Sequence, residues 1–288
     1  MALRLSPHMT VMANAAHKAA RRLLRDFAEV EQLQVSVKGP SDFVSQADLR
    51  AEQTLKEELN KARPGYAFVM EESGSSGSDN WAWRWVVDPL DGTTNFLHGM
   101  PHWCISIGLE RRLADGGSEL AAGLVYAPPT DEMFWAEKGA GAFVNERRLR
   151  VSARRELKEA VFATGIPFAA VAPARRTAFS RTLALLMPRV AGVRRFGAAA
   201  LDLAWVAAGR YDGYWELGVK RWDIAAGLLL VREAGGYATD VGNADPRDTG
   251  DVVAANPHLH PKLREAVLAG MAPSAARAES GRPVDRTS

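Results

Sequence analysis

Four short apolar runs follow one another between Cys104 and Val144, and residues typical of turns separate them. The runs cover residues 104–109, 121–126, 133–137 and 142–144. Gly139-Ala140-Gly141 supplies a tight turn between the last two. Short runs with short connections are typical of antiparallel strands, whereas parallel strands need long crossovers. This stretch therefore predicts a hairpin-rich antiparallel sheet, which limits the folds open to the rest of the chain.

Two amphipathic helices are predicted before this sheet. Residues 6–30 carry apolar groups at helical spacing, and a second helix begins near Ser45 and Asp48, which are spaced as a capping pair. Capping alone accounts for Asp48. The apolar side of the second helix is formed by Leu49, Leu55 and Leu59, and Pro64-Gly65 ends it. Between and after these helices the sequence predicts loops at residues 37–42 and 73–79 and a strand at residues 66–70.

Helices alternate with strands in the second half of the chain, which predicts layered α/β packing. Strands are expected at residues 160–164, 193–196, 211–216, 237–240 and 251–255, and helices at 172–190, 198–209, 222–234 and 261–271. The helix at 172–190 offers Leu183, Leu185, Leu186 and Met187 for burial. Without an internal repeat or a linker, we expect one domain over residues 1–271 with two lobes, about 1–152 and 153–271. Residues 272–288 are expected to form a disordered tail.

Composition excludes several functional classes. The net charge of the 288 residues is +2, so no global field favours nucleic acid or an anionic membrane. Cys104 is the only cysteine, which excludes an intrachain disulfide, and its apolar run predicts an inert core thiol. Neither a signal peptide nor a membrane-spanning run is visible, so we expect a soluble, cytoplasmic protein.

The segment Asp88-Pro89-Leu90-Asp91-Gly92-Thr93-Thr94-Asn95 follows the apolar run Trp85-Val86-Val87. It places two carboxylates at a strand end, in a turn at Pro89, just before a helix start. Such a place can bring a divalent cation and a phosphate together. A simple turn that caps a helix would use the same residue types. The segment alone therefore leaves both interpretations open.

Further acids lie at strand ends or helix starts elsewhere, at Glu71 and Asp223, and the Leu90 carbonyl offers another oxygen. Magnesium binds through a few carboxylates, waters and substrate phosphate. The chain lacks a Walker A sequence, a GxGxxG and a G-x-S-x-G. Because no covalent nucleophile is evident, metal-activated water is the economical hypothesis.

With these motifs in order over about residues 10–270, the chain resembles the inositol monophosphatase family. The first signature is Asp88 to Phe96, and the second is Trp222-Asp223-Ile224-Ala225-Ala226-Gly227 with Glu216-Leu217-Gly218 upstream. Comparable motifs are Glu71-Glu72-Ser73, Asp42-Phe43-Val44-Ser45 with Asp48, and Gly141-Ala142-Phe143 with Asn145. The resemblance implies a layered αβαβα sandwich of the sugar-phosphatase type and a magnesium-dependent phosphomonoesterase.

The resemblance also implies two to three magnesium ions per site. Glu71, Asp88 and the Leu90 carbonyl would bind the first, and Asp88, Asp91 and Asp223 the second. A looser third site would involve Glu71, with Asp48 nearby through water. Thr93 and Glu71 would orient and deprotonate the attacking water, with Asp91 beside them in the catalytic set. The Gly92 and Thr93 N–H groups would hold the phosphate.

For the organic part of the substrate, the resemblance implies Asp91, Gly197-Ala198-Ala199 and Glu216, whose carboxylate can accept hydrogen bonds from vicinal hydroxyls. Ala198 departs from the usual Ser or Thr. Lys220-Arg221 is unusually basic and is expected to attract a second anionic group. His98 and His102 are expected to have structural roles. Thr94, where nucleotide-bisphosphate phosphatases carry Lys, favours the inositol phosphate or histidinol phosphate branches.

The chain is most similar to the bacterial SuhB-type members of the family, in Arg194-Arg195-Phe196-Gly197 and Ala200-Leu201-Asp202-Leu203-Ala204. We therefore expect a phosphatase for a small polyol monophosphate, with myo-inositol 1-phosphate as first candidate. The resemblance further suggests a homodimer and inhibition by lithium. The alternatives are a histidinol-phosphate phosphatase and a regulatory partner of the transcription machinery that binds no nucleic acid directly.

Overall fold

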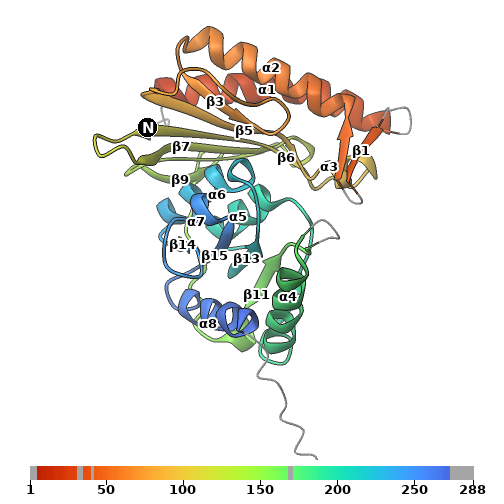
Figure 1. Ribbon diagram of the computed structural model, residues 1–288, viewed down its shortest axis with the longest axis vertical. Helices are drawn as coiled ribbons and strands as arrows, with labels where there is room; N and C mark the ends of the chain where they lie inside the picture. Colours follow the sequence, from red (N-terminus) through yellow and green to blue (C-terminus); the bar gives the residue numbers. More distant parts are fainter. Residues whose placement is uncertain (1–4, 31–34, 40–41, 168–170, 273–288) are drawn as a thin grey trace, which may run out of the picture.

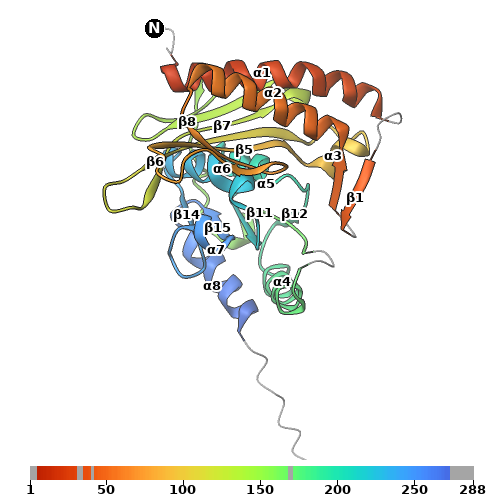
Figure 2. The same cartoon turned by 45° about the horizontal axis from the view of Figure 1, so that its top comes forward.

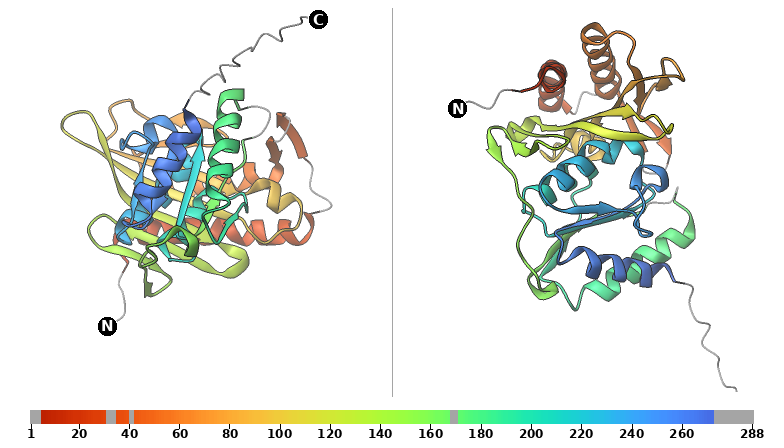
Figure 3. Two further views of the ribbon diagram at one scale, coloured as in Figure 1. Left: turned by 90° about the horizontal axis from the view of Figure 1, so that it is seen from below. Right: turned by 90° about the vertical axis from the view of Figure 1, so that its left-hand side faces the viewer.

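Five layers are stacked in the order helices, sheet, helices, sheet, helices (Figures 1 and 3). The computed structural model describes residues 5–30, 35–39, 42–167 and 171–272. The predicted tail at 272–288 lies outside this part except for its first residue. Within the described residues, no helix combines the length and the apolar character needed to cross a membrane.

The first sheet has eight strands in the order β10-β9-β8-β7-β6-β5-β3-β4. They are β3 (Ala67–Met70), β4 (Gly74–Ser76), β5 (Trp83–Asp91), β6 (Cys104–Arg112), β7 (Ser118–Ala127), β8 (Glu132–Glu137), β9 (Gly141–Val144) and β10 (Arg147–Arg148). Only β3 and β5 pair in parallel; all other neighbours are antiparallel. The predicted hairpin-rich antiparallel sheet is confirmed.

Two long helices, α1 (Pro7–Ala28) and α2 (Gln46–Ala62), lie side by side on the outer face of this sheet (Figure 2). Helix α1 begins where expected because Ser6 caps it: the Ser6 hydroxyl accepts a hydrogen bond from the Met9 N–H. Their apolar sides form one core with the sheet, in which Leu55 and Leu59 are fully buried. Leu49 was expected in this core but is exposed.

The second sheet has the order β12-β11-β13-β15-β14. Its strands are β11 (Val161–Thr164), β12 (Gly192–Arg194), β13 (Gly213–Leu217), β14 (Tyr237–Thr239) and β15 (Asp251–Ala255). Strand β11 pairs in parallel with β12 and β13, and the other pairs are antiparallel. Helices α4 (Pro173–Leu186) and α8 (His260–Met271) cover its outer face. Leu185 and Met187 were expected to be buried there but are exposed, and Leu186 faces the core.

The middle layer consists of α5 (Ala199–Ala207) and α6 (Arg221–Glu233), between the two sheets (Figure 3). Helix α6 lies directly on the first sheet, because two strand glycines leave room for its backbone. A Cβ at Gly123 would lie 3.0 Å from the Ala226 Cα, and one at Gly108 3.0 Å from the Ala225 Cβ. Helix α6 is thus fixed against β6 and β7, and β6 pairs with β5, the strand that carries the acidic motif.

Two predicted loops contain strands. Residues 37–42 were expected to be irregular, but β1 (Val35–Gly39) and β2 (Asp42–Ser45) pair as an antiparallel hairpin. Gly39 is the last residue of β1, and residues 40–41 lie outside the described part of the chain. Residues 73–79 include β4, which pairs with the edge of β3. The remaining short helices are α3 (Thr93–Leu97) and α7 (Pro246–Thr249), with 3-10 turns at Pro128–Thr130 and Leu157–Glu159.

Candidate active site

The acidic motif is part of strand β5 and not a turn after it. Asp88 lies opposite Ser106 and Asp91 opposite Cys104, so three steps on β5 match two on β6. This is a β-bulge, and Pro89, which has no N–H for the ladder, is within it. The expected turn at Pro89 is therefore wrong. An extra residue changes the strict alternation of a strand, which allows acids three positions apart to face the same site.

Asp88 is buried at the centre of this site. Its Oδ1 accepts a hydrogen bond of 2.9 Å from the Leu90 N–H. Burial raises the pKa of Asp88 well above its usual value, and the neighbouring charges of Glu71, Asp91 and Asp223 raise it further. Glu71 and Asp223 lie far from Asp88 and Asp91 in the sequence, so the fold has brought them close enough for their charges to act on Asp88.

Asp91 connects β5 to the middle layer. Its carboxylate accepts hydrogen bonds from the Ala200 N–H at 2.7 Å and the Ala199 N–H at 3.2 Å, in the first turn of α5. Burial raises the pKa of Asp91 to about 6, and the N–H donors limit the rise. The predicted substrate segment at 197–199 thus supplies an N–H to Asp91 itself.

Asp223 enters the site from the first turn of α6. Its Oδ2 accepts a 2.8 Å hydrogen bond from the Lys220 N–H, which fixes the side chain at the helix start. Burial raises the pKa of Asp223 well above its usual value, and Asp91, Glu71 and Glu216 add to the effect. Strand β5, the turn after β3 and the first turn of α6 therefore contribute acids to the same region.

Glu71 lies in the turn between β3 and β4, and its N–H donates to the Val87 carbonyl on β5 at 3.3 Å. The turn is held from α2 by Glu52, whose carboxylate accepts hydrogen bonds from the Glu72 and Ser73 N–H groups at 2.8 and 2.9 Å. Sequence reasoning missed Glu52. Its only signal was a charged residue at a position on the apolar side of a helix, and it is 5% exposed.

The donor set suits a hard divalent cation. Carboxylate and carbonyl oxygens are the ligands of magnesium, and a cation would offset the repulsion that raises these pKa values. Within the described residues, no three His, Cys, Asp or Glu side chains already converge around one point. The acids form an interacting cluster whose chemistry fits a cation.

Two backbone features shape the motif after Asp91. Gly92 has φ +94°, and a Cβ there would lie 2.9 Å from the His102 carbonyl oxygen, so only glycine fits. The Thr93 Oγ1 donates a 3.0 Å hydrogen bond to the Leu90 carbonyl. Asn95 then donates to the carbonyls of His102 and Phe196, both at 2.7 Å, and so ties the motif to the segment before α5.

Glu216 is on β13, at the second sheet's side of the site. The Tyr214 hydroxyl donates to its carboxylate. Burial raises the pKa of Glu216 to about 7, and the Asp91 charge contributes. The carboxylate lies directly over Gly165, where a Cβ would be within 2.1 Å of both Glu216 oxygens. In the sequence, Gly165 is recognisable only as the residue that follows the predicted strand at 160–164.

The Arg221 guanidinium binds Glu110 on β6, with Nε 2.9 Å from Oε1, and the Arg221 side chain remains 25% exposed. The expected attraction of a second anionic group by Lys220-Arg221 stays a prediction. Lys220 is exposed. Ala198 is buried, and Gly197 before it has φ +80°.

Other predicted residues have structural contacts. The His98 Nδ1 lies 2.8 Å from the Thr94 carbonyl oxygen, and His102 packs on Phe196 and Trp205. Burial lowers the pKa of His102 to about 4. Burial raises the pKa of the Cys104 thiol, as expected of an inert core thiol. Asp48 is buried in the first turn of α2, and the Ser45 side chain lies outside the described part.

The five layers and the acid cluster define a layered α/β sandwich of the sugar-phosphatase type. The model of the inositol monophosphatase family matches residues 5–272, and the chain belongs to this family.

Named relatives agree with this assignment. An inositol-1-monophosphatase of Rhizobium meliloti is 51% identical over 260 residues, which are 90% of this chain and 95% of the relative. A Nus factor SuhB of Pseudomonas aeruginosa is 40% identical and covers 90% of this chain and 100% of the relative. The crystal structure of the extragenic suppressor protein suhB from Bartonella henselae is 50% identical with a TM-score of 0.85, covering 91% and 98% of the two chains.

Proposed function

We propose that this chain is a magnesium-dependent phosphomonoesterase for a small polyol monophosphate, with myo-inositol 1-phosphate as the first candidate. The observation that carries the proposal is the cluster of Glu71, Asp88, Asp91 and Asp223, in which the neighbouring acids add to the raised pKa of Asp88 and of Asp223. The name of the Rhizobium relative supports the substrate class.

In this proposal, Glu71, Asp88, Asp91, Asp223 and the Leu90 carbonyl hold two to three magnesium ions. When bound, the ions neutralise phosphate charge and make water more acidic. Thr93 and Glu71 orient the attacking water, and the Glu71 carboxylate accepts its proton. The hydrogen bond from Thr93 to the Leu90 carbonyl holds the hydroxyl at the edge of the acid cluster. The Gly92 and Thr93 N–H groups bind the phosphate oxygens.

Glu216 is the proposed recognition group for the polyol. A carboxylate can accept hydrogen bonds from two neighbouring hydroxyls, and Tyr214 and Gly165 fix its position. Ala198 offers no side-chain hydroxyl, and the Ala199 N–H contacts Asp91. We therefore propose that the 197–199 segment acts on the polyol through Asp91, which it holds in place.

The test is phosphate release from inositol 1-phosphate, histidinol phosphate, fructose 1,6-bisphosphate and a nucleotide bisphosphate, with magnesium or with chelator. We expect magnesium-dependent release that prefers inositol 1-phosphate. Asp88→Asn keeps an oxygen for the Leu90 N–H and should lose about 10²- to 10³-fold in rate. A preference for histidinol phosphate would move the chain to that branch. If the folded protein released no phosphate from any of them, the proposal would be rejected.

A second candidate is a regulatory role in transcription, because a relative of 40% identity is named a Nus factor. The test is a pull-down of RNA polymerase components with wild type and Asp88→Asn, with and without magnesium. Equal recovery in all four samples would support this role. Recovery no greater than that with an unrelated protein would exclude it.

The same proposal includes three properties carried by the family resemblance. The protein would be a cytoplasmic homodimer inhibited by lithium. Light scattering of the purified protein measures the oligomer. Lithium titration at two magnesium concentrations tests whether lithium acts at a magnesium site, since competition predicts weaker inhibition at the higher concentration.

A further inference from the structure

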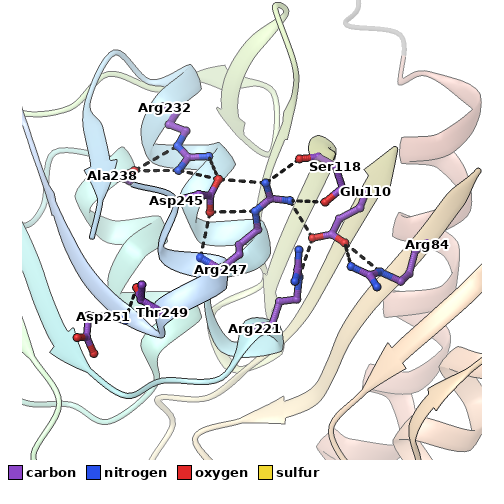
Figure 4. A network of polar contacts seen from close by, with 10 residues as sticks. All are labelled: Arg84, Glu110, Ser118, Arg221, Arg232, Ala238, Asp245, Arg247, Thr249 and Asp251. Carbon is purple, nitrogen blue, oxygen red and sulfur yellow. Dashed lines mark hydrogen bonds and ion pairs between the residues drawn. The ribbon is translucent and has the colours of Figure 1, made fainter. Parts of the chain in front are cut away.

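A buried carboxylate outside the acid cluster is surrounded by three arginines (Figure 4). Glu110, on β6, is fully buried. Its oxygens accept hydrogen bonds from Arg221 Nε at 2.9 Å, Arg247 at 2.9 Å and Arg84 Nε at 3.0 Å. Burial by itself would raise the pKa of Glu110, but Arg221, Arg84 and Arg247 hold it below its usual value. The carboxylate is therefore charged and fully compensated.

The three arginines connect Glu110 to different parts of the fold. Arg84 is on β5, Arg247 on α7 and Arg221 at the first position of α6. Arg247 is further bound to Asp245 and to the Ser118 carbonyl, both at 3.0 Å, so its guanidinium is held by other groups besides Glu110. The contact of Arg221 with Glu110 differs from the other two, because it connects Glu110 to the helix turn that carries Asp223.

Strand β6 holds the first turn of α6 at two points. Ser106 and Glu110, on either side of Gly108, face the helix: the Ser106 hydroxyl donates to the Trp222 carbonyl at 3.3 Å, and Glu110 binds Arg221. Gly108 between them lets the helix approach, since a Cβ there would lie 3.0 Å from that of Ala225. Strand β6 therefore determines where the first turn of α6, and with it Asp223, lies.

The same strand is the partner of the acidic motif. Ser106 pairs directly with Asp88. Strand β6 therefore fixes Asp88 through the sheet ladder and Asp223 through Arg221 and Ser106. We propose that Glu110, acting through Arg221, is a positioning residue that sets Asp223 at the distance from Asp88 and Asp91 at which all three bind one divalent cation. This inference rests on the proposed function.

The direction in which magnesium affinity changes distinguishes a positioning role of Arg221 from an effect of its charge. Arg221 is a cation beside an acid cluster, so charge alone predicts that its removal strengthens magnesium binding. Loss of the contact that positions Asp223 predicts the opposite result, that magnesium binding weakens. Residues that orient metal ligands typically change metal affinity 10- to 100-fold.

The experiment is isothermal titration of magnesium chloride into the folded, substrate-free protein. Arg221→Gln should weaken binding about tenfold, and Arg221→Lys, which keeps the charge, should recover part of it. Lys220→Gln removes the neighbouring charge, and Arg84→Gln removes another partner of Glu110; both should bind magnesium within threefold of wild type. Circular dichroism verifies folding, and the Arg221 variants are preferred because Glu110→Gln would remove the carboxylate that Arg84, Arg221 and Arg247 share.

Phosphate release supplies the second measurement. For Arg221→Gln, the magnesium concentration for half-maximal rate should rise about tenfold, while KM for the phosphate ester and kcat at saturating magnesium stay within threefold. Unchanged or tighter magnesium binding in this variant would overturn the inference. A raised KM with unchanged magnesium affinity would also overturn it and assign Arg221 to substrate attraction. If wild type neither bound magnesium nor released phosphate, the proposed function and this inference would fail together.

Discussion

The carboxylate of Asp91 accepts a 2.7 Å hydrogen bond from the N–H of Ala200, which lies 109 residues further along the chain. A charged group on the first sheet is thereby bound to the start of a middle-layer helix. The contact places an acid where the helix dipole and free N–H groups favour negative charge. Burial works against that charge, and the balance between the two effects is measurable.

Asp91→Asn should be increasingly stabilising relative to wild type as the pH rises. In chelator, the folded protein keeps a proton on Asp91 up to a pKa of about 6, against 3.8 as the ordinary value. The folded state binds more protons in that window, so wild type loses stability as pH rises through it. The difference in unfolding free energy should shift by on the order of 3 kcal/mol between pH 4 and 8. Urea unfolding at both pH values measures it, and a pH-independent difference would contradict the shifted pKa.

His102 should make the folding stability depend on pH in the opposite direction, with stability lost as the pH falls. Burial lowers its pKa from 6.5 to about 4, so the unfolded chain takes up a proton first as the pH falls. Stability is then lost between pH 6.5 and 4, by about 3 kcal/mol if the full shift is expressed. Proton NMR of the His102 ring, assigned with His102→Gln, should show titration below pH 5. Titration near 6.5 would mean that the ring is not shielded by Phe196 and Trp205.

Asp88→Asn should be more stable than wild type in chelator and less responsive to magnesium. The substitution removes one of four mutually repelling acids and retains an acceptor for the Leu90 N–H. We expect the Tm in chelator to rise by a few degrees, at roughly 2 °C per kcal/mol. Wild type should gain Tm on magnesium addition by mass action, whereas the variant should not. Scanning calorimetry with and without magnesium tests both statements, and an equal magnesium response would remove Asp88 from the ligands.

Gly165→Ala should impair substrate binding through Glu216 alone. The new methyl group would lie within 2.1 Å of the Glu216 carboxylate, so that side chain must move. KM for inositol 1-phosphate should rise about tenfold, the equivalent of about 1.4 kcal/mol, with magnesium affinity unchanged. In a Glu216→Ala background the same substitution should add no more than about twofold. An equal effect in both backgrounds would show that Gly165 matters for another reason.

The layered fold and the order of its elements could be predicted because they depend on local patterns. The strands between Cys104 and Val144 and the helix capped by Ser6 have periodicity and turn residues that act over a few positions. Burial in the exposed helix α4 was predicted less well, since Leu185 and Met187 are apolar but turn outward. Apolar character alone does not fix which side of a helix faces its sheet.

The acids of the site could be named from the sequence, but their supports could not. Glu110 reads as an ordinary charge after an apolar run, and only the packing of α6 on β6 brings Arg221 to it. The bulge at Pro89 could not be predicted from the sequence either, because the same residue types are also typical of a turn. Such features depend on pairing between distant segments, which no local pattern records.

The two glycines under α6, Gly108 and Gly123, also bear on how such a chain can diverge. Because α6 rests on strand backbone there, no strand side chain at these two positions separates Ala225 and Ala226 from β6 and β7, and β6 is the neighbour of the strand that carries Asp88. Substitutions in the outer layers can then accumulate without changing the spacing of the acids. The spacing of the acid cluster would be inherited through two residues that have no side chain to vary.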